Sequence, residues 1–178
     1  MAIDPSKIAV SKTHIYTPGE IVFSIGLYRT ATINLRNDHK FVISGNSKKR
    51  SLITHASLIM KKALGFREGL TIEITDNVGF RHCGFGSSSG LIATVACAIN
   101  ELYGAPVGDA YLVKYLAQNH GEEIDGTDEY LYPVQCIGGS AASGICAAGR
   151  IVLAGKSSVI AKMKIPKEFK VIIGIPRD

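Results

Sequence analysis

The stretch Gly84-Phe85-Gly86-Ser87-Ser88-Ser89-Gly90 runs directly into an apolar segment that ends near Tyr103. Large apolar side chains recur in that segment at helical spacing, at Leu91, Ile92, Val95, Ile99 and Leu102. Glycine and alanine fill the positions between them and let a neighbouring element approach closely. The pattern therefore predicts a long central helix that begins at a Gly- and Ser-rich loop.

The residue types in this loop favour a phosphate-binding site. Its backbone N–H groups and three hydroxyls lie at the positive end of a helix dipole, and its glycines let an anion approach the backbone. A simple serine cap on a core helix is the alternative, but it needs one serine and no glycine pair. We expect Ser88→Ala or Gly86→Val to weaken nucleotide binding and to leave the melting temperature within a few degrees.

Two common phosphate loops do not fit the sequence. A Walker A loop ends in Gly-Lys-Ser or Gly-Lys-Thr, whereas this loop ends in Ser-Gly and contains no lysine. A dinucleotide fingerprint has glycines at relative positions 1, 3 and 6, whereas here they fall at 1, 3 and 7. The loop therefore belongs to another class.

Around the loop, strand and helix patterns alternate. Strand patterns at 8–10, 20–27, 31–35 and 41–44 predict a small antiparallel sheet, followed by a helix from Ser51 to Gly65 and a strand at 70–75. A second amphipathic helix is predicted at 109–119, and strands at 150–154, 158–163 and 169–175. We expect an α+β fold with two layers, a mixed or mainly antiparallel sheet on one side and three helices on the other.

Composition narrows the class of protein. The 178 residues are 46% hydrophobic and 20% charged, which excludes a disordered or coiled-coil chain. The net charge of +5 is dispersed, with Lys48-Lys49-Arg50 as the longest basic run, so it favours small anionic ligands over nucleic acid. No apolar run is long enough to cross a membrane and no secretion signal is visible, so we expect a cytoplasmic protein without a membrane partner.

The loop resembles the second motif of the GHMP kinase superfamily, the group of galactokinase, homoserine kinase, mevalonate kinase and phosphomevalonate kinase. That motif reads Pro-x-x-x-Gly-Leu-Gly-Ser-Ser-Ala/Ser, and residues 84–89 match its core, whereas the stretch before them lacks the proline. The order of strands, loop and helices is also similar. The resemblance implies the N-terminal domain fold of these kinases, of the ribosomal S5 domain 2-like type, with ATP and Mg²⁺ as cofactors.

The resemblance also implies roles for individual residues. Gly84, Phe85, Gly86, Ser87, Ser88, Ser89 and Gly90 would hold the nucleotide phosphates. Gly126-Thr127-Asp128 is similar to the family's Ser-Gly-x-Asp region, which makes Asp128 the candidate base, with Asp125 second. Ser88 and Glu122 are the candidate Mg²⁺ ligands. Gly138, Gly139 and Ser140 either bring the backbone close to substrate or form a tight turn before a strand.

Other basic and acidic residues near these motifs give weaker indications of a functional role. Arg81 and Lys114 are further candidates for phosphate neighbours. Thr17-Pro18-Gly19-Glu20 is only weakly similar to the family's first motif, so the resemblance assigns no role to Glu20.

The resemblance implies ATP-dependent phosphorylation of a small hydroxylated metabolite, such as a sugar, homoserine or a mevalonate-like compound. Two alternatives stay open: a phosphoribosyl-transferring synthase of the methanopterin-pathway type, or a non-catalytic nucleotide-binding subunit. The family's third motif has no counterpart, so we expect residues 1–178 to form one N-terminal domain without the C-terminal domain. Expected partners are the nucleotide, a small substrate, and a second copy or another chain that completes the fold.

Overall fold

The computed structural model describes residues 19–44, 49–76, 85–122, 131–146, 149–170 and 172–174. Its strands are β1 (Glu20–Phe23), β2 (Arg29–Arg36), β3 (Phe41–Ser44), β4 (Gly69–Asp76), β5 (His120–Glu122), β6 (Tyr132–Val134), β7 (Arg150–Ala154) and β8 (Ser158–Met163). Its helices are α1 (Arg50–Leu64), α2 (Ser87–Leu102), α3 (Asp109–Gln118) and α4 (Gly139–Ile145). The predicted α+β class is confirmed, and α4 is a helix beyond the three that the sequence predicted.

One sheet has the strand order β2–β4–β3. β2 is antiparallel to β4, with Arg29 opposite Asp76 and Arg36 opposite Gly69, whereas β3 is parallel to β4. The predicted antiparallel sheet of the first 45 residues is therefore wrong within the described range, because β4 lies between β2 and β3 and β1 belongs to another sheet. Alternation along a strand indicates which face is buried, but it does not identify the neighbouring strand.

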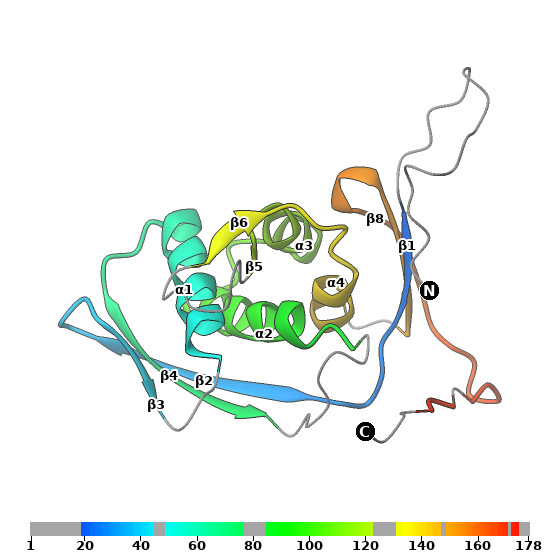
Figure 1. Cartoon of the computed structure of the whole chain (residues 1–178), viewed down its shortest axis with the longest axis horizontal. Helices are drawn as coiled ribbons and strands as arrows, with labels where there is room; N and C mark the ends of the chain where they lie inside the picture. The colour runs from blue at the N-terminus through cyan, green and yellow to red at the C-terminus, as the bar shows by residue number, and fades with distance from the viewer. Residues whose placement is uncertain are drawn as a thin grey trace, which may run out of the picture.

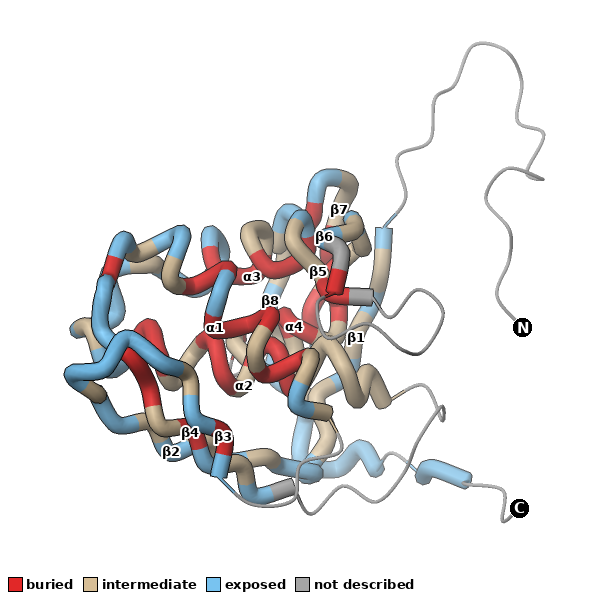
Figure 2. Tube along the Cα trace, turned by 60° about the vertical axis from the view of Figure 1, so that its left-hand side comes forward, coloured by how far each residue is buried: buried red, intermediate tan, exposed pale blue. Residues whose placement is uncertain are grey.

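Helices α1 and α2 cover one face of this sheet (Figure 1). α1 begins at Arg50, one residue before the expected cap at Ser51, and it ends at Gly65, which has a positive φ of 71° and donates its N–H to the Lys61 carbonyl at 2.9 Å. Most of the apolar stripe of α2 is buried, with Val95 and Ile99 at 0% exposure, whereas Leu102 at its end is 37% exposed. The predicted central position of α2 is confirmed, and Figure 2 shows buried residues gathered in these helices and in the neighbouring α3.

A second sheet has the order β1–β7–β8 and is antiparallel throughout. This sheet packs against α4 and carries a smaller core. Ile151 and Leu153 of β7 lie in this core with Val113 of α3, Ala142 of α4 and Cys146, the C-cap residue of α4. β1 leads through residues 24–28 into β2 and so connects the two sheets (Figure 1). As a result, α4 lies between α2 and this second sheet.

The predicted buried strand at 169–175 is wrong for the residues that can be described there. Residues 169, 170 and 172–174 are not in a strand, and Phe169 and Ile172 are 67% and 93% exposed. An apolar run becomes a buried strand only if another strand pairs with it and a core covers it. None of the three described sheets includes this segment.

A membrane-crossing helix is also absent from the described part of the chain. None of its helices combines the necessary length with the necessary hydrophobicity.

Candidate functional site

The Gly- and Ser-rich stretch forms the start of α2, as predicted. Gly86 is the N-cap residue, with a left-handed conformation (φ 60°, ψ 40°) that favours glycine, and its carbonyl accepts a 2.7 Å hydrogen bond from the N–H of Gly90. The first turn contains no acidic residue, and its N-cap glycine makes no side-chain cap. Every described residue from Phe85 to Gly90 is partly exposed. The positive end of the helix dipole therefore lies in a partly exposed turn.

The start of α4 lies against the start of α2. A Cβ added to Gly86 would lie 2.0 Å from Ser140 Oγ and 2.3 Å from Ser140 Cβ, so the two residues are in close contact. The predicted nucleotide loop and the predicted substrate residues Gly138, Gly139 and Ser140 are thus brought together, although Gly86 and Ser140 are 54 positions apart in sequence. The three residues begin a helix rather than a strand, with Gly138 as its left-handed N-cap (φ 90°).

Glu20 of β1 occupies the start of α4. Its Oε2 accepts a 3.0 Å hydrogen bond from the N–H of Gly139. A Cβ on Gly139 would lie 2.3–2.5 Å from the Glu20 carboxyl atoms, so glycine is needed for this approach. The carboxylate stabilises the helix start in the way that an acidic cap does. Sequence patterns assign Glu20 no role, since its partner Gly139 lies 119 positions further along the chain.

Arg29, the first residue of β2, was also missed by sequence reasoning. Its Nη1 lies 3.1 Å from the position that a Cβ would take on Gly90, which places the guanidinium beside the first turn of α2. Its Nε and Nη2 atoms are buried. No motif or spacing signals this residue, since only the packing of α2 on β2 brings the two together.

Most of the predicted acid–base and metal residues lie outside the part of the chain that the structure describes. Gly84, Asp125, Asp128 and Arg81 lie outside the described residues, and Glu122 lies on β5 without a described side chain. Within the described ranges, no three His, Cys, Asp or Glu side chains gather as metal ligands would. The described part of the candidate metal site is thus the hydroxyl of Ser88, in the first turn of α2.

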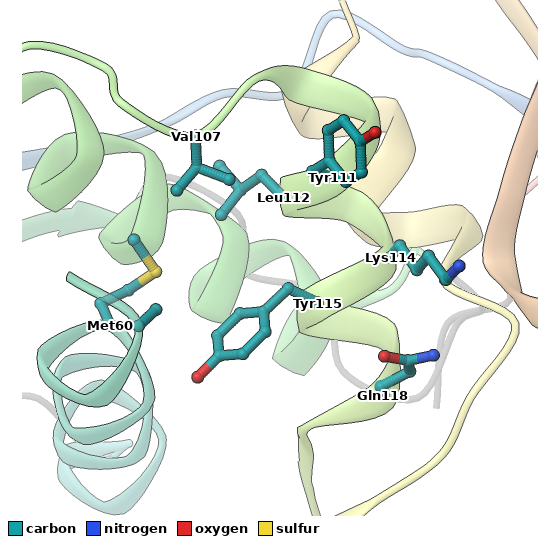
Figure 3. A pocket seen from close by; sticks show the side chains of 8 residues that line it. Met60, Val107, Tyr111, Leu112, Lys114, Tyr115 and Gln118 are labelled. Carbon is teal, nitrogen blue, oxygen red and sulfur yellow. The ribbon is translucent and has the colours of Figure 1, made fainter.

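A separate cavity of about 320 Å³ lies between α1 and α3 (Figure 3). Its lining is mainly apolar and includes Met60 and Ala63 of α1 and Leu112 and Tyr115 of α3. The Tyr115 hydroxyl donates a 2.7 Å hydrogen bond to the Ile59 carbonyl, and burial raises the pKa of Tyr115. Lys114, a predicted phosphate neighbour, lines this cavity, which includes no residue of the α2 or α4 starts.

The close contact of Gly86 with Ser140 corrects one expectation about substitutions. Gly86→Val was expected to leave the melting temperature nearly unchanged, but a valine would have to adopt a left-handed conformation and displace Ser140. That substitution therefore disrupts the packing of two helices. Ser88 lies in the partly exposed first turn, so a substitution there should test the loop with less effect on helix packing.

Comparison with known proteins supports the resemblance to GHMP kinases. Residues 51–129 match the family described as GHMP kinases N terminal domain, a range that includes the Gly- and Ser-rich loop and all of α2. No curated protein sequence matches the chain significantly. Residues 51–129 are therefore similar to a GHMP kinase N-terminal domain.

Three solved structures share the fold. A phosphomevalonate kinase of Streptococcus pneumoniae is 19% identical with a TM-score of 0.56, and the match covers 79% of this chain and 42% of that one. A mevalonate kinase is 17% identical with a TM-score of 0.60, covering 84% and 50%. A D-glycero-D-manno-heptose 1-phosphate kinase from Bacteriodes thetaiotaomicron is 18% identical with a TM-score of 0.54, covering 80% and 50%. The match thus spans half the length of these structures or less.

Proposed function

We propose that this chain binds ATP at the start of α2 and takes part in the phosphorylation of a small hydroxylated metabolite. The observation that carries the proposal is the accessible first turn of α2, which begins at a left-handed glycine and has neither an acidic residue nor a capping side chain. Such a helix start offers N–H groups and a positive dipole to a phosphate. The family of the domain supports ATP as the anion.

The described residues fit a nucleotide polyphosphate. Gly86 presents backbone without a Cβ, and three serine hydroxyls follow it on the first turn. Mg²⁺ binds phosphate oxygens together with a few protein oxygens and neutralises part of the charge that develops during transfer. We propose Ser88 and Glu122 as its protein ligands. Ser88 offers a hydroxyl beside the anion site, and Glu122 rests on the family resemblance.

Phosphoryl transfer requires mainly positioning and charge neutralisation. In the proposed reaction the acceptor hydroxyl attacks the γ-phosphorus of ATP, the bond to the β,γ-bridging oxygen breaks, and ADP leaves. The hydroxyl proton passes to Asp128, with Asp125 as the second candidate base. We propose that Ser140 contacts the acceptor, because its hydroxyl lies next to Gly86 whereas the N–H of Gly139 is already bonded to Glu20.

A direct test is a calorimetric titration of the chain with MgATP and, separately, with phosphoribosyl diphosphate. The proposal predicts saturable binding of MgATP, followed by ADP release when a sugar, homoserine or mevalonate is added. Binding of phosphoribosyl diphosphate alone would replace the kinase proposal with the synthase alternative. Binding of MgATP without ADP release from any acceptor would support the non-catalytic subunit for the chain tested.

A further inference from the structure

The cavity between α1 and α3 has the features of a small-molecule site (Figure 3). Met60 of α1 and Leu112 of α3 line it and are 0% and 2% exposed, so they form its inner wall. Its volume of about 320 Å³ falls at the lower end of the range for ligand pockets, which are mostly apolar with a few polar groups. If each non-hydrogen atom of a ligand takes roughly the 30 Å³ of a liquid water molecule, the cavity holds about ten such atoms.

Three polar side chains of α3 border this apolar lining. Tyr111, Lys114 and Gln118 follow one another at helical spacing and so lie on one face of α3, and Figure 3 shows them along the α3 side of the cavity. No described residue forms a side-chain hydrogen bond or an ion pair with any of the three. Tyr115 differs, because its hydroxyl already donates to the Ile59 carbonyl at 2.7 Å. Phenol and ammonium groups donate hydrogen bonds, so this side of the cavity favours a ligand that accepts them.

The charge of the lining indicates which kind of acceptor fits. Among the described residues that line the cavity, Lys114 is the only charged one, and no carboxylate lies there with it. A cationic ligand would be repelled by its ammonium group, whereas an anionic ligand would be attracted. One ammonium group neutralises one negative charge, which matches a carboxylate better than a phosphate group with its charge of about −2.

We propose that this cavity binds an aliphatic monocarboxylate of the medium-chain fatty-acid class. Its apolar chain lies against Met60, Ala63 and Leu112, and its carboxylate accepts hydrogen bonds from Lys114. A chain of about eight carbons with two carboxylate oxygens has the ten or so non-hydrogen atoms that the volume allows. The inference goes beyond the proposed function and does not rest on it, because the cavity includes no residue of the α2 or α4 starts.

The experiment compares three probes that share one chain and differ in charge: octanoate, 1-octanol and octylammonium. Binding is followed by chemical-shift mapping of the backbone amides. Octanoate is expected to shift the amides of Ala63, Leu112 and Tyr115 saturably, 1-octanol to bind at least fivefold more weakly, and octylammonium to bind more weakly than 1-octanol. Added salt should weaken the binding of octanoate and leave that of 1-octanol nearly unchanged.

Variants separate the charge of the cavity from its volume. Lys114→Met is expected to lower the affinity for octanoate to that for 1-octanol. Lys167→Met is the matched control, because it makes the same change at an exposed lysine that does not line the cavity. Ala63→Leu, at an exposed position of α1, fills part of the cavity and should weaken both probes at least fivefold while the melting temperature stays nearly the same.

Three outcomes would overturn the inference. The first is the absence of saturable shifts around the cavity with octanoate. The second is equal binding of the three probes, or octanoate binding by Lys114→Met that matches the unaltered protein, because either result would show that charge plays no part. The third is a lower mass of Ala63→Leu in sedimentation together with no octanoate binding, which would mean that a second copy of the chain covers this face.

Discussion

The starts of α2 and α4 are built alike but are used differently. Each begins at a left-handed glycine without a side-chain cap of its own, and each has a serine in its first turn. At α4 the Glu20 carboxylate accepts the Gly139 N–H, so the chain supplies its own anion. At α2 the first turn has no acidic residue, and the Arg29 guanidinium lies beside it.

This difference shows why a glycine-rich helix start is not by itself evidence of a ligand site. The same sequence signal serves an internal structural contact in one place and leaves an accessible positive region in the other. What separates the two is the charge that the rest of the fold brings to each. Three substitutions test the contrast, beginning with the one that should have the largest effect, and a fourth tests the interior of α2.

Gly86→Val should break the contact between the two helix starts. The left-handed conformation and the overlap with Ser140 together cost about 3 kcal/mol, which lowers the melting temperature by roughly 10 °C. Differential scanning calorimetry measures this directly. Adding Ser140→Gly to the variant should recover the part of the loss that comes from overlap, and a double variant as unstable as Gly86→Val would argue against the described contact.

Ser88→Ala should weaken MgATP binding and leave the stability of the fold nearly unchanged. The loss of the hydroxyl that we propose binds the nucleotide is expected to weaken MgATP binding about tenfold, with little change in melting temperature. Ser158→Ala, at the exposed start of β8, is the matched control and should bind normally. A large drop in stability without a loss of affinity would favour the simple helix-cap interpretation of the serines.

Glu20→Ala should lower the stability of the fold and leave MgATP binding unchanged. Removal of the carboxylate leaves the Gly139 N–H without this partner and is expected to destabilise the protein by about 1 kcal/mol, measured by urea denaturation. Glu20→Gln keeps an acceptor oxygen and should lose less. MgATP affinity should be similar in both variants, and a tenfold loss in either would mean that the start of α4 belongs to the nucleotide site.

Cys97 provides a smaller test within the body of α2. Burial raises the pKa of its thiol to about 11, above its ordinary value near 9. Because the unfolded chain loses this proton at lower pH than the folded one, the thiol's contribution to stability is complete below about pH 9 and is lost as the pH rises through 11. The difference in melting temperature between the unaltered protein and Cys97→Ala should therefore shrink over that range. A constant difference would contradict a buried, protonated thiol.

Local patterns in the sequence predicted the parts of the fold that depend on neighbours along the chain. The stripe of α2 and the Gly- and Ser-rich start at Gly86 are contiguous, so periodicity and composition were sufficient to locate them. The helix ending at Gly65 was predictable for the same reason. The insertion of β4 between β2 and β3 was not, because strand pairing is decided by contacts between distant segments.

The candidate site shows the same division. The loop itself was predicted, but Glu20, Arg29 and the contact of Gly86 with Ser140 all depend on residues far apart in sequence. The apolar run at 169–175 illustrates the reverse error, since residues with a buried-strand composition are largely exposed where they can be described. Composition describes what a segment prefers, and only the fold decides whether a partner is present.

Phosphate binding at the start of α2 is tested most directly by chemical-shift mapping of the backbone amides during a titration with MgATP. We expect the amides of Ser87, Ser88 and Ser89 to shift strongly and saturably, whereas the amide of Gly139, held by Glu20, should shift little. Shifts centred on Gly139 with silent amides at the start of α2, or no saturable shift at either helix start, would contradict it.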